Sequence, residues 1–597
     1  MSGGLFDQAE AAMARGDLFS AYDAATAAIE SGSDDQRFKY IQVLALARMG
    51  DVSQARERYE RYGLSASQDV DIASLGARLL KDDALSQSPR DPKALLAASE
   101  AYGAIYARTG DTFPGVNAAT LAMLGGAEEK ARTIALELLA KLIAPQGYFA
   151  HATKAEALLV CRRAHEAGVE IAIACSLPDA DLGARATTRR QFTVLADHLA
   201  LTQGERAALL DPLKPPVVFM FCGHMIPRAD PAAEAALAAS IGKLLDEEGA
   251  AIGYGALASG ADILVAEQLL KRGGELNVVL PFHAEDFVQQ SVRPAGESWG
   301  PRFQACLDRA QTVTMATDMP FMDDAAQFTY GSLICMGLAR LRAQNLSADV
   351  MQLAVWDGIA AEKGDKAGTA VDVSNWRRTN GRMRSIPPTW RRSKPKRLWP
   401  LGSRGRKSPE APKNADEITR ESRAIIFTDF HGFTKLQESA LPVFWKQVMR
   451  RMMRVLDQYG DAICYRNTWG DALYSVIVDT KQAAAITLDL QDSLKDVDHA
   501  ALGIGAEPHM RIGAHYGPVF RAKEGGNGAL NYYGTQVSRT ARIEPVTPPG
   551  AVYVTEQFAA ALIMEAPEAF VCRYVGPVQL AKGYGASRMY LLKRARV

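Results

Sequence analysis

An internal repeat near the N-terminus restricts the fold of this chain more than any other feature. A Gly-Asp pair at Gly16 recurs at Gly50, 34 residues later, and a similar pair follows at Gly110. Residues 1–142 are rich in Ala, Leu, Glu and Arg, with apolar positions at helical spacing. Gly and Ala allow two helices to approach closely, and Asp caps the helix that follows. The repeat therefore predicts stacked helical hairpins.

The spacing and residue types of residues 1–142 resemble tetratricopeptide repeats. The resemblance implies a docking surface for a partner protein or a regulatory lever, and plain helical scaffolding is the alternative that stays open. Residues 143–213 continue with helical periodicity and are predicted to be a helical connector.

Length, charge and cysteine spacing exclude several classes of protein. A chain of 597 residues is too long for one hydrophobic core and predicts roughly three or four domains. Lys plus Arg and Asp plus Glu number 68 each, so we expect no nucleic-acid partner. The seven cysteines lie far apart and are interpreted as reduced thiols. Because neither a signal peptide nor a long apolar run occurs, we predict a cytoplasmic protein without a membrane span.

The sequence pattern changes after Pro216. Val217–Cys222 is typical of a buried strand, and two helices and a further strand at Leu276–Leu280 follow it. This alternation predicts a Rossmann-like α/β domain with a parallel sheet over residues 214–360. Turns that contain Gly223 and Gly253–Gly260 follow strands, where parallel sheets bind their ligands.

The second of these turns, together with Glu267 in the following helix, resembles the Rossmann-like SLOG superfamily. The resemblance implies a ligand-sensing domain for a small nucleotide-like molecule, although the PGGxGT signature of the enzymatic relatives is absent. Two alternatives stay open. The glycines could only pack helix against strand, or the domain could be a nucleotide N-glycosidase that uses Glu267.

A basic segment, residues 361–420, follows the α/β domain. Arg and Lys recur through it together with Pro, and apolar clusters are almost lacking. We predict a flexible, solvated linker in preference to a tether for an anionic membrane or nucleic acid.

Two aspartates mark the most informative region of the sequence. Ala424–Phe427 is an apolar strand that leads into Asp429 and the turn Gly432–Thr434, and a later pair of strands flanks a turn with Asp471. A carboxylate at a strand end can hold Mg²⁺, and a Gly turn can offer backbone N–H groups to phosphate. If the two strands of the later pair lie beside the first, both aspartates converge on one site, as a two-metal phosphoryl transfer requires.

Five motifs in this region resemble, in order, those of class III nucleotide cyclases. They are Phe427–Thr434, the turn at Asp471, Arg511–Gly517, Gly534–Glu544 and Lys582–Gly585. The resemblance covers residues 421–597 and implies an α+β, ferredoxin-like domain. It assigns the metal to Asp429, Asp471 and the carbonyl group of Phe430, the phosphates to Gly432, Phe433, Thr434, Arg511 and Lys582, and the transition-state charge to Arg542.

The implied reaction is attack of the 3′-hydroxyl of a nucleoside triphosphate on its α-phosphorus, with loss of pyrophosphate. The family also implies two Mg²⁺ or Mn²⁺ per site and a head-to-tail homodimer. Asn467 and Asn531 stand at the base-selecting positions and match neither purine pattern, and Ser538 replaces a ribose-orienting Asn. We place ATP first and keep GTP or a pyrimidine open. The alternative function is a degenerate cyclase fold that binds nucleotide as a sensor or scaffold.

Overall fold

The computed structural model of the protein describes residues 2–228, 230–362, 366–390, 418–498, 502, 509–523 and 530–595. The chain divides into two compact units. The first comprises Met1–Pro215 with Gln344–Ala348, and the second comprises Pro216–Ala343 with Asp349–Val597. Among the described residues, no helix is both long and apolar enough to cross a lipid bilayer.

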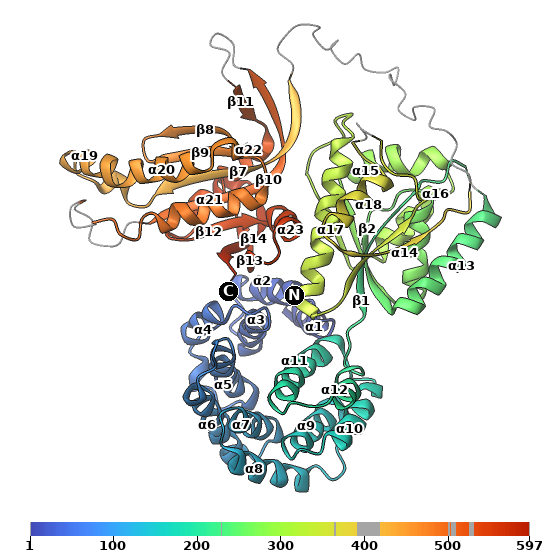
Figure 1. The fold of residues 1–597 in the computed structure, drawn as a ribbon, viewed down its shortest axis with the longest axis vertical. Coiled ribbons are helices and arrows are strands. Elements are labelled where there is room, and N and C mark those ends of the chain that lie inside the picture. Colours follow the sequence, from blue (N-terminus) through green and yellow to red (C-terminus); the bar gives the residue numbers. More distant parts are fainter. Residues whose placement is uncertain are drawn as a thin grey trace. The chain divides into compact units, whose positions relative to one another are not determined.

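The first unit is built from helices that pack in sequence order along a curve (Figure 1). Asp17, Asp51 and Asp111 cap α2, α4 and α7 by accepting first-turn backbone hydrogen bonds, as the repeat predicts. The helices are α1 (Ser2–Ala14), α2 (Leu18–Glu30), α3 (Gln36–Arg48), α4 (Val52–Arg61), α5 (Val70–Leu85), α6 (Pro92–Thr109), α7 (Thr112–Leu124), α8 (Glu128–Lys141), α9 (Gly147–Val160), α10 (Ala164–Ser176), α11 (Leu182–His198) and α12 (Gln203–Leu210).

The predicted connector, residues 143–213, packs as a continuation of the repeats. One buried apolar core runs from Val116 on α7 to Leu213, and Phe192 on α11 is fully enclosed in it. Helix α11 lies inside the curve and contacts α1, α7 and α9 (Figure 1). These helices therefore share their core with the repeats that precede them.

The second unit begins with a six-stranded, fully parallel sheet in the order β4-β3-β2-β1-β5-β6. The predicted α/β class is confirmed. Its elements are β1 (Val217–Gly223), α13 (Pro231–Glu248), β2 (Ala250–Gly255), α14 (Ala261–Lys271), β3 (Glu275–Leu280), α15 (Ala284–Phe287), α16 (Trp299–Asp308), β4 (Thr312–Met315), α17 (Ala326–Leu346), β5 (Val350–Val355), α18 (Thr369–Arg377) and β6 (Arg382–Ile386).

The predicted start of the linker, at residue 361, is wrong. Helix α18 follows that position, and β6 pairs with β5 along its whole length. Strand β6 could not be predicted from the sequence because it has no apolar run. It is an edge strand in which only Ile386 is buried, and it carries two basic side chains. The rest of the predicted linker, residues 391–417, lies outside the described residues.

The C-terminal part of the second unit is a mixed eight-stranded sheet in the order β13-β14-β12-β10-β7-β9-β8, with β11 paired to β10. Its elements are β7 (Thr419–Phe430), α19 (Leu441–Phe444), α20 (Arg450–Gln458), β8 (Ile463–Trp469), β9 (Ala472–Ile477), α21 (Thr480–Asp492), β10 (Met510–Lys523), β11 (Leu530–Tyr533), α22 (Thr535–Thr540), β12 (Val552–Thr555), α23 (Glu556–Glu565), β13 (Phe570–Gln579) and β14 (Ala586–Arg594).

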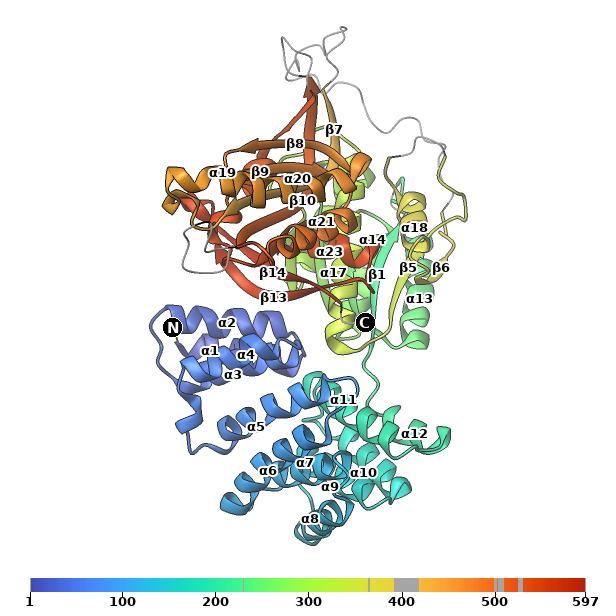
Figure 2. The same ribbon diagram turned by 60° about the vertical axis from the view of Figure 1, so that its left-hand side comes forward.

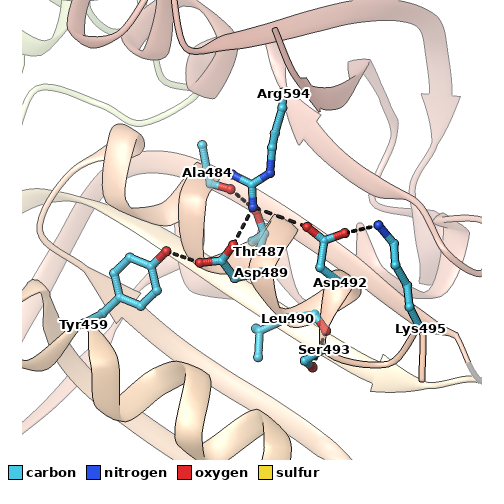
Figure 3. Close-up of polar contacts among 9 residues, drawn as sticks. All are labelled: Tyr459, Ala484, Thr487, Asp489, Leu490, Asp492, Ser493, Lys495 and Arg594. Atoms are coloured by element: carbon cyan, nitrogen blue, oxygen red, sulfur yellow. Dashed lines mark hydrogen bonds and ion pairs between the residues drawn. The ribbon is translucent and has the colours of Figure 1, made fainter. Parts of the chain in front are cut away.

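The order β7-α20-β8-β9-α21-β10, with the sheet order β10-β7-β9-β8, is the ferredoxin-like arrangement. The predicted α+β class of the C-terminal domain is thus confirmed. Helix α21 contacts both α20 and α23, and α20 and α21 cover the same face of the sheet (Figure 2). Polar contacts join this layer to the last strand, because Arg594 on β14 pairs with Asp489 and Asp492 on α21 (Figure 3).

Candidate active site

The register of the central strands brings the predicted metal ligand and phosphate ligand together. Asp429, near the end of β7, lies directly opposite Arg511 on β10, so both side chains project from the same face of the sheet. The guanidinium Nη2 of Arg511 forms an ion pair with Oδ2 of Asp429. We name this face, which also carries α22, the catalytic face.

The second predicted metal ligand lies beside the first. Strand β9 pairs with both β7 and β8, and Asp471 lies in the tight turn between β8 and β9. Burial raises the pKa of Asp471 to about 6, and the negative charge of Asp429 adds to the rise. The carboxylates of Asp429 and Asp471 are therefore close enough to interact electrostatically.

The donor set of this pair fits a magnesium ion. Mg²⁺ prefers oxygen ligands and is commonly held by one or two carboxylates together with substrate phosphates. Asp429, Asp471 and the carbonyl group of Phe430 would provide oxygen donors of this kind. Among the described residues, no cluster of three or more His, Cys, Asp or Glu side chains is placed to hold a metal ion by itself.

Glu544 is a member of the site whose role the sequence did not reveal. Its Oε1 lies 3.1 Å from Nε of Arg511, so Arg511 stands between two carboxylates, Asp429 and Glu544. Burial raises the pKa of Glu544 to about 7, with Arg511 opposing the rise. A Cβ atom on Gly513 would lie 2.7 Å from the backbone nitrogen of Glu544, so only glycine permits this approach.

The predicted phosphate turn follows β7. Gly432 has φ +90°, in the left-handed region that glycine adopts readily, and it opens a single 3₁₀ turn, Phe433–Lys435. The helix that follows begins later, at Leu441, so this turn is separate from the N-terminus of that helix. Phe433 packs against Phe444 with ring centroids 5.0 Å apart, whereas the Thr434 side chain is exposed.

The other predicted catalytic residues gather around α22. Ser538 is exposed on this helix, and Arg542 lies two residues beyond its end. The backbone N–H of Ala581 donates to the carbonyl group of Arg542 at 3.3 Å, which brings the loop with exposed Lys582 beside Arg542. Lys582 itself has φ +61°.

The two predicted base-selecting residues have different surroundings. Asn467 on β8 lies opposite Tyr474, which lies opposite Phe427, so Asn467 projects from the catalytic face. The rings of Phe427 and Tyr474 stack at 4.8 Å. Asn531 on β11 alternates with Tyr532, which packs in the aromatic cluster of the catalytic face, and its Oδ1 accepts the N–H of Tyr532 at 2.7 Å. The base-selecting role of Asn531 stays a prediction.

The glycine turns of the α/β domain are filled by the protein itself. A Cβ on Gly223 would lie 2.2 Å from that of Ala261, and one on Gly255 would lie 2.2 Å from the Phe221 ring. Glu267 makes a two-pronged ion pair with Arg302 at 2.7 Å, and Arg302 also binds Glu234. These contacts favour the packing interpretation of the glycines and remove the support for a glycosidase that uses Glu267.

The ferredoxin-like sheet and its paired aspartates define residues 416–594 as a class III nucleotide cyclase domain. This range matches the family model of the adenylate and guanylate cyclase catalytic domain. Residues 20–122 match the Tetratricopeptide Repeats-Sensor family, so the predicted repeats are confirmed. The chain is similar to the receptor-type guanylate cyclase gcy-8 of Caenorhabditis elegans, with 29% identity over 189 residues, 29% of this chain and 16% of that protein. It thus spans less than a fifth of that relative.

Two solved structures resemble the C-terminal domain. The adenylyl cyclase CyaB from P. aeruginosa is 20% identical, covers 30% of this chain and 97% of its own, and gives a TM-score of 0.27. The guanylate cyclase domain of RhGC from Catenaria anguillulae, solved in complex with GTP, is also 20% identical, with coverages of 30% and 100% and a TM-score of 0.26.

Proposed function

We propose that the protein is a cytoplasmic nucleotide cyclase that converts a nucleoside triphosphate, ATP first, to a 3′,5′-cyclic monophosphate and pyrophosphate. The observation that carries this proposal is the convergence of Asp429 and Asp471 on one face of a cyclase domain. Two carboxylates, one on β7 and one in the adjoining β8–β9 turn, suit a reaction in which bound metal ions neutralise phosphate charge. GTP and the pyrimidine triphosphates are the other substrates to be tested.

The residues of the site divide the work between binding and charge stabilisation. Asp429 and Asp471 would hold two Mg²⁺ or Mn²⁺ ions, which supply Lewis acidity toward the ribose hydroxyl and the phosphates when they are bound. Arg511 and Lys582 would bind the β- and γ-phosphates, and Arg542 would stabilise charge on the α-phosphoryl group. Ser538 would orient the ribose through its hydroxyl group.

The guanidinium group of Arg511 forms an ion pair with Asp429. Substrate phosphates would compete for the same guanidinium, and Glu544 would keep it within reach of the site. We therefore expect Arg511 to exchange partners when the nucleotide binds. Its replacement by Lys would keep the charge and remove the two-pronged geometry.

We further propose that the active form is a head-to-tail homodimer with two composite sites. This follows from the cyclase family, in which the metal aspartates and the transition-state arginine of one site belong to different protomers. The helical repeats and the α/β domain would then control the rate, through a protein partner and a small nucleotide-like ligand respectively.

The alternative is a nucleotide-binding domain without turnover, and the replacement of the usual Asn by Ser538 favours it. One assay separates the two functions. Purified full-length protein is incubated with Mg²⁺ or Mn²⁺ and with ATP, GTP, UTP or CTP in turn, and cyclic monophosphates are measured by mass spectrometry against Asp429→Ala. A product above this blank supports the enzyme and names its base. Nucleotide binding without any product would support the sensor.

A further inference from the structure

The segment between β4 and α17, residues 316–325, is fixed to the body of the α/β domain. The hydroxyl of Thr317 donates to the carbonyl group of Pro281 at 3.0 Å, and Nε2 of His283 lies 3.0 Å from the carbonyl oxygen of Asp318. The N–H of Phe321 donates to Asp286 at 2.8 Å. We call this segment the β4–α17 segment. It leaves the sheet at the carboxyl ends of the strands, the edge at which open parallel sheets bind ligands.

The β4–α17 segment also contacts the cyclase domain, at α22 and at the start of β7. Oδ2 of Asp318 forms an ion pair with Nη2 of Arg539 at 2.6 Å. The sulfur of Met319 accepts weak hydrogen bonds from Arg420 at 3.4 Å and from Gln536 at 3.6 Å. Met319 and Gln536 are buried in this contact, at 9% and 2% exposure. The contact between Met319 and Gln536 is therefore packed, whereas the side chain of Asp318 is 61% exposed where it meets Arg539.

Helix α17 makes a second contact behind the first. The buried hydroxyl of Tyr330 donates to the carbonyl group of Tyr516 on β10 at 2.8 Å. A Cβ on Gly337 would lie 2.0 Å from the carbonyl oxygen of Ala560 on α23, so this glycine permits close packing of the two helices. The α/β domain thus touches four elements of the cyclase domain, β7, β10, α22 and α23, and α22 lies between the β4–α17 segment and β10.

The contact bears on catalysis because α22 carries Ser538 and leads into Arg542. The helix has only six residues, so a displacement of its backbone moves all of its side chains together. Gln536 and Arg539 are held by the β4–α17 segment, whereas exposed Ser538 is left for the substrate. The N–H of Arg542 donates to the carbonyl group of Arg539 at 2.9 Å, so the two arginines are neighbours along one turn. A misplacement of about 1 Å can cost roughly 10²-fold in rate.

We infer that Asp318 and Met319 are positioning residues for α22, and that the α/β domain completes the cyclase by holding this helix in its catalytic register. The inference rests on the proposed function. Its chemistry is specific, because a carboxylate meets a guanidinium and a thioether meets an amide and a second guanidinium. A ligand that moves the strand-end edge of the α/β sheet would move α22 with it.

The first test replaces Asp318 by Asn in the full chain, with Asp323→Asn as the matched control. Asp323 is exposed in the same segment and takes no part in the contacts above. We expect Asp318→Asn to lower kcat about tenfold while KM for the nucleotide changes less than twofold, because the helix is misplaced and the phosphate ligands are untouched. A kcat equal to that of the control, or one that rises, would overturn the inference.

The second test does not depend on catalysis. Amide hydrogen exchange of residues 535–542 in the full chain should become about tenfold faster in Asp318→Asn and in Met319→Ala than in Asp323→Asn. Exchange that does not change would overturn the inference even if the enzyme is active. If wild type makes no cyclic nucleotide but exchange responds, the proposed function fails and the contact stands.

A double-mutant cycle of Asp318→Asn with Arg539→Gln measures the coupling between these two side chains. If the two residues act through each other, their effects on exchange are not additive, and the double variant resembles the worse single variant. Additive effects would mean that the two side chains act through separate contacts, and they would contradict the inference.

Discussion

Glycines at predicted ligand-binding positions occur in both parts of the second unit, and they serve different purposes. In the α/β domain, Gly223 and Gly255 are regular strand residues whose missing side chains make room for Ala261 and Phe221. In the cyclase domain, Gly432 and Gly470 have φ values of +90° and +64°. Apart from the adjacent residues of the chain, no described atom lies closer than 4.0 Å to a Cβ at either position. The first pair permits packing, and the second permits a backbone turn that faces open space.

The acidic residues of the same two regions differ in a parallel way. Asp262 and Asp372 in the α/β domain are each 7% exposed, and each has one oxygen without a hydrogen-bond partner in the described part of the chain. The Asp429 side chain is 27% exposed and paired with Arg511. A carboxylate that must bind a metal ion has to remain accessible, whereas an enclosed carboxyl group is stabilised mainly by keeping its proton.

The largest effect is expected for the open carboxylates. Asp471→Ala should lower cyclic nucleotide formation roughly 10³-fold, because a metal clamp supplies several kcal/mol of charge stabilisation. The rate is measured by mass spectrometry of the product. Asp461→Ala, an exposed aspartate just before β8, is the control and should keep the wild-type rate. Full activity of Asp471→Ala would contradict the assignment of the site.

The glycine comparison predicts a smaller effect on stability. Gly255→Ala should destabilise the α/β domain by about 2 kcal/mol, because the new methyl group overlaps the Phe221 ring. Gly432→Ala meets no such overlap and should cost about 1 kcal/mol through its left-handed backbone alone. Calorimetric transitions of the full chain measure both changes. Equal losses of stability in the two variants would contradict the idea that Gly255 is needed for packing and Gly432 only for its backbone conformation.

The enclosed carboxylates predict a pH dependence of stability. Burial raises the pKa of Asp262 and of Asp372 to about 7, well above the ordinary value of 3.8. The folded state therefore holds these protons more tightly than the unfolded chain. Their contribution to stability is complete below about pH 4 and is lost as the pH rises through 7.

Thermal midpoints at pH 5 and pH 8 test this dependence. Between pH 5 and pH 8 the free energy of unfolding should fall by ~2 kcal/mol less in Asp262→Asn than in wild type. The matched control is Asp246→Asn, because Asp246 is an exposed aspartate on α13. This variant should lose as much unfolding free energy between the two pH values as wild type does. A loss in Asp262→Asn as large as in wild type would show that other groups cause the pH dependence.

The smallest effect is expected for the exposed ion pairs between β14 and α21. Arg594 pairs with Asp489 and Asp492, but its side chain is 46% exposed, so water and salt screen these pairs (Figure 3). Arg594→Ala should lower stability by less than about 1 kcal/mol and leave turnover unchanged. Chemical denaturation at low and high salt measures the difference. A large loss of turnover would connect this cluster to the active site.

Part of the fold and site could be predicted from local patterns. The apolar run before Asp429 and the two strands around Asp471 are strand and turn signals, and the predicted elements occur where those signals stand. The edge strand β6 escaped prediction because its side chains are mostly exposed and basic. The role of Glu544 could not be predicted, because it depends on Arg511 of β10, which is distant in sequence and reaches Glu544 only in the folded chain.

The sequence by itself determined the helical repeats, the alternation of strands and helices, and the family of the C-terminal domain. These depend on periodicity and on residue types at fixed spacing, which are local properties of the chain. Only the tertiary structure decided that the α/β glycines are filled by side chains, that Asn531 alternates with an aromatic residue of the catalytic face, and that Asp318 reaches Arg539. Burial and pairing between distant segments follow from packing, and no local pattern encodes which side chain will fill a given space.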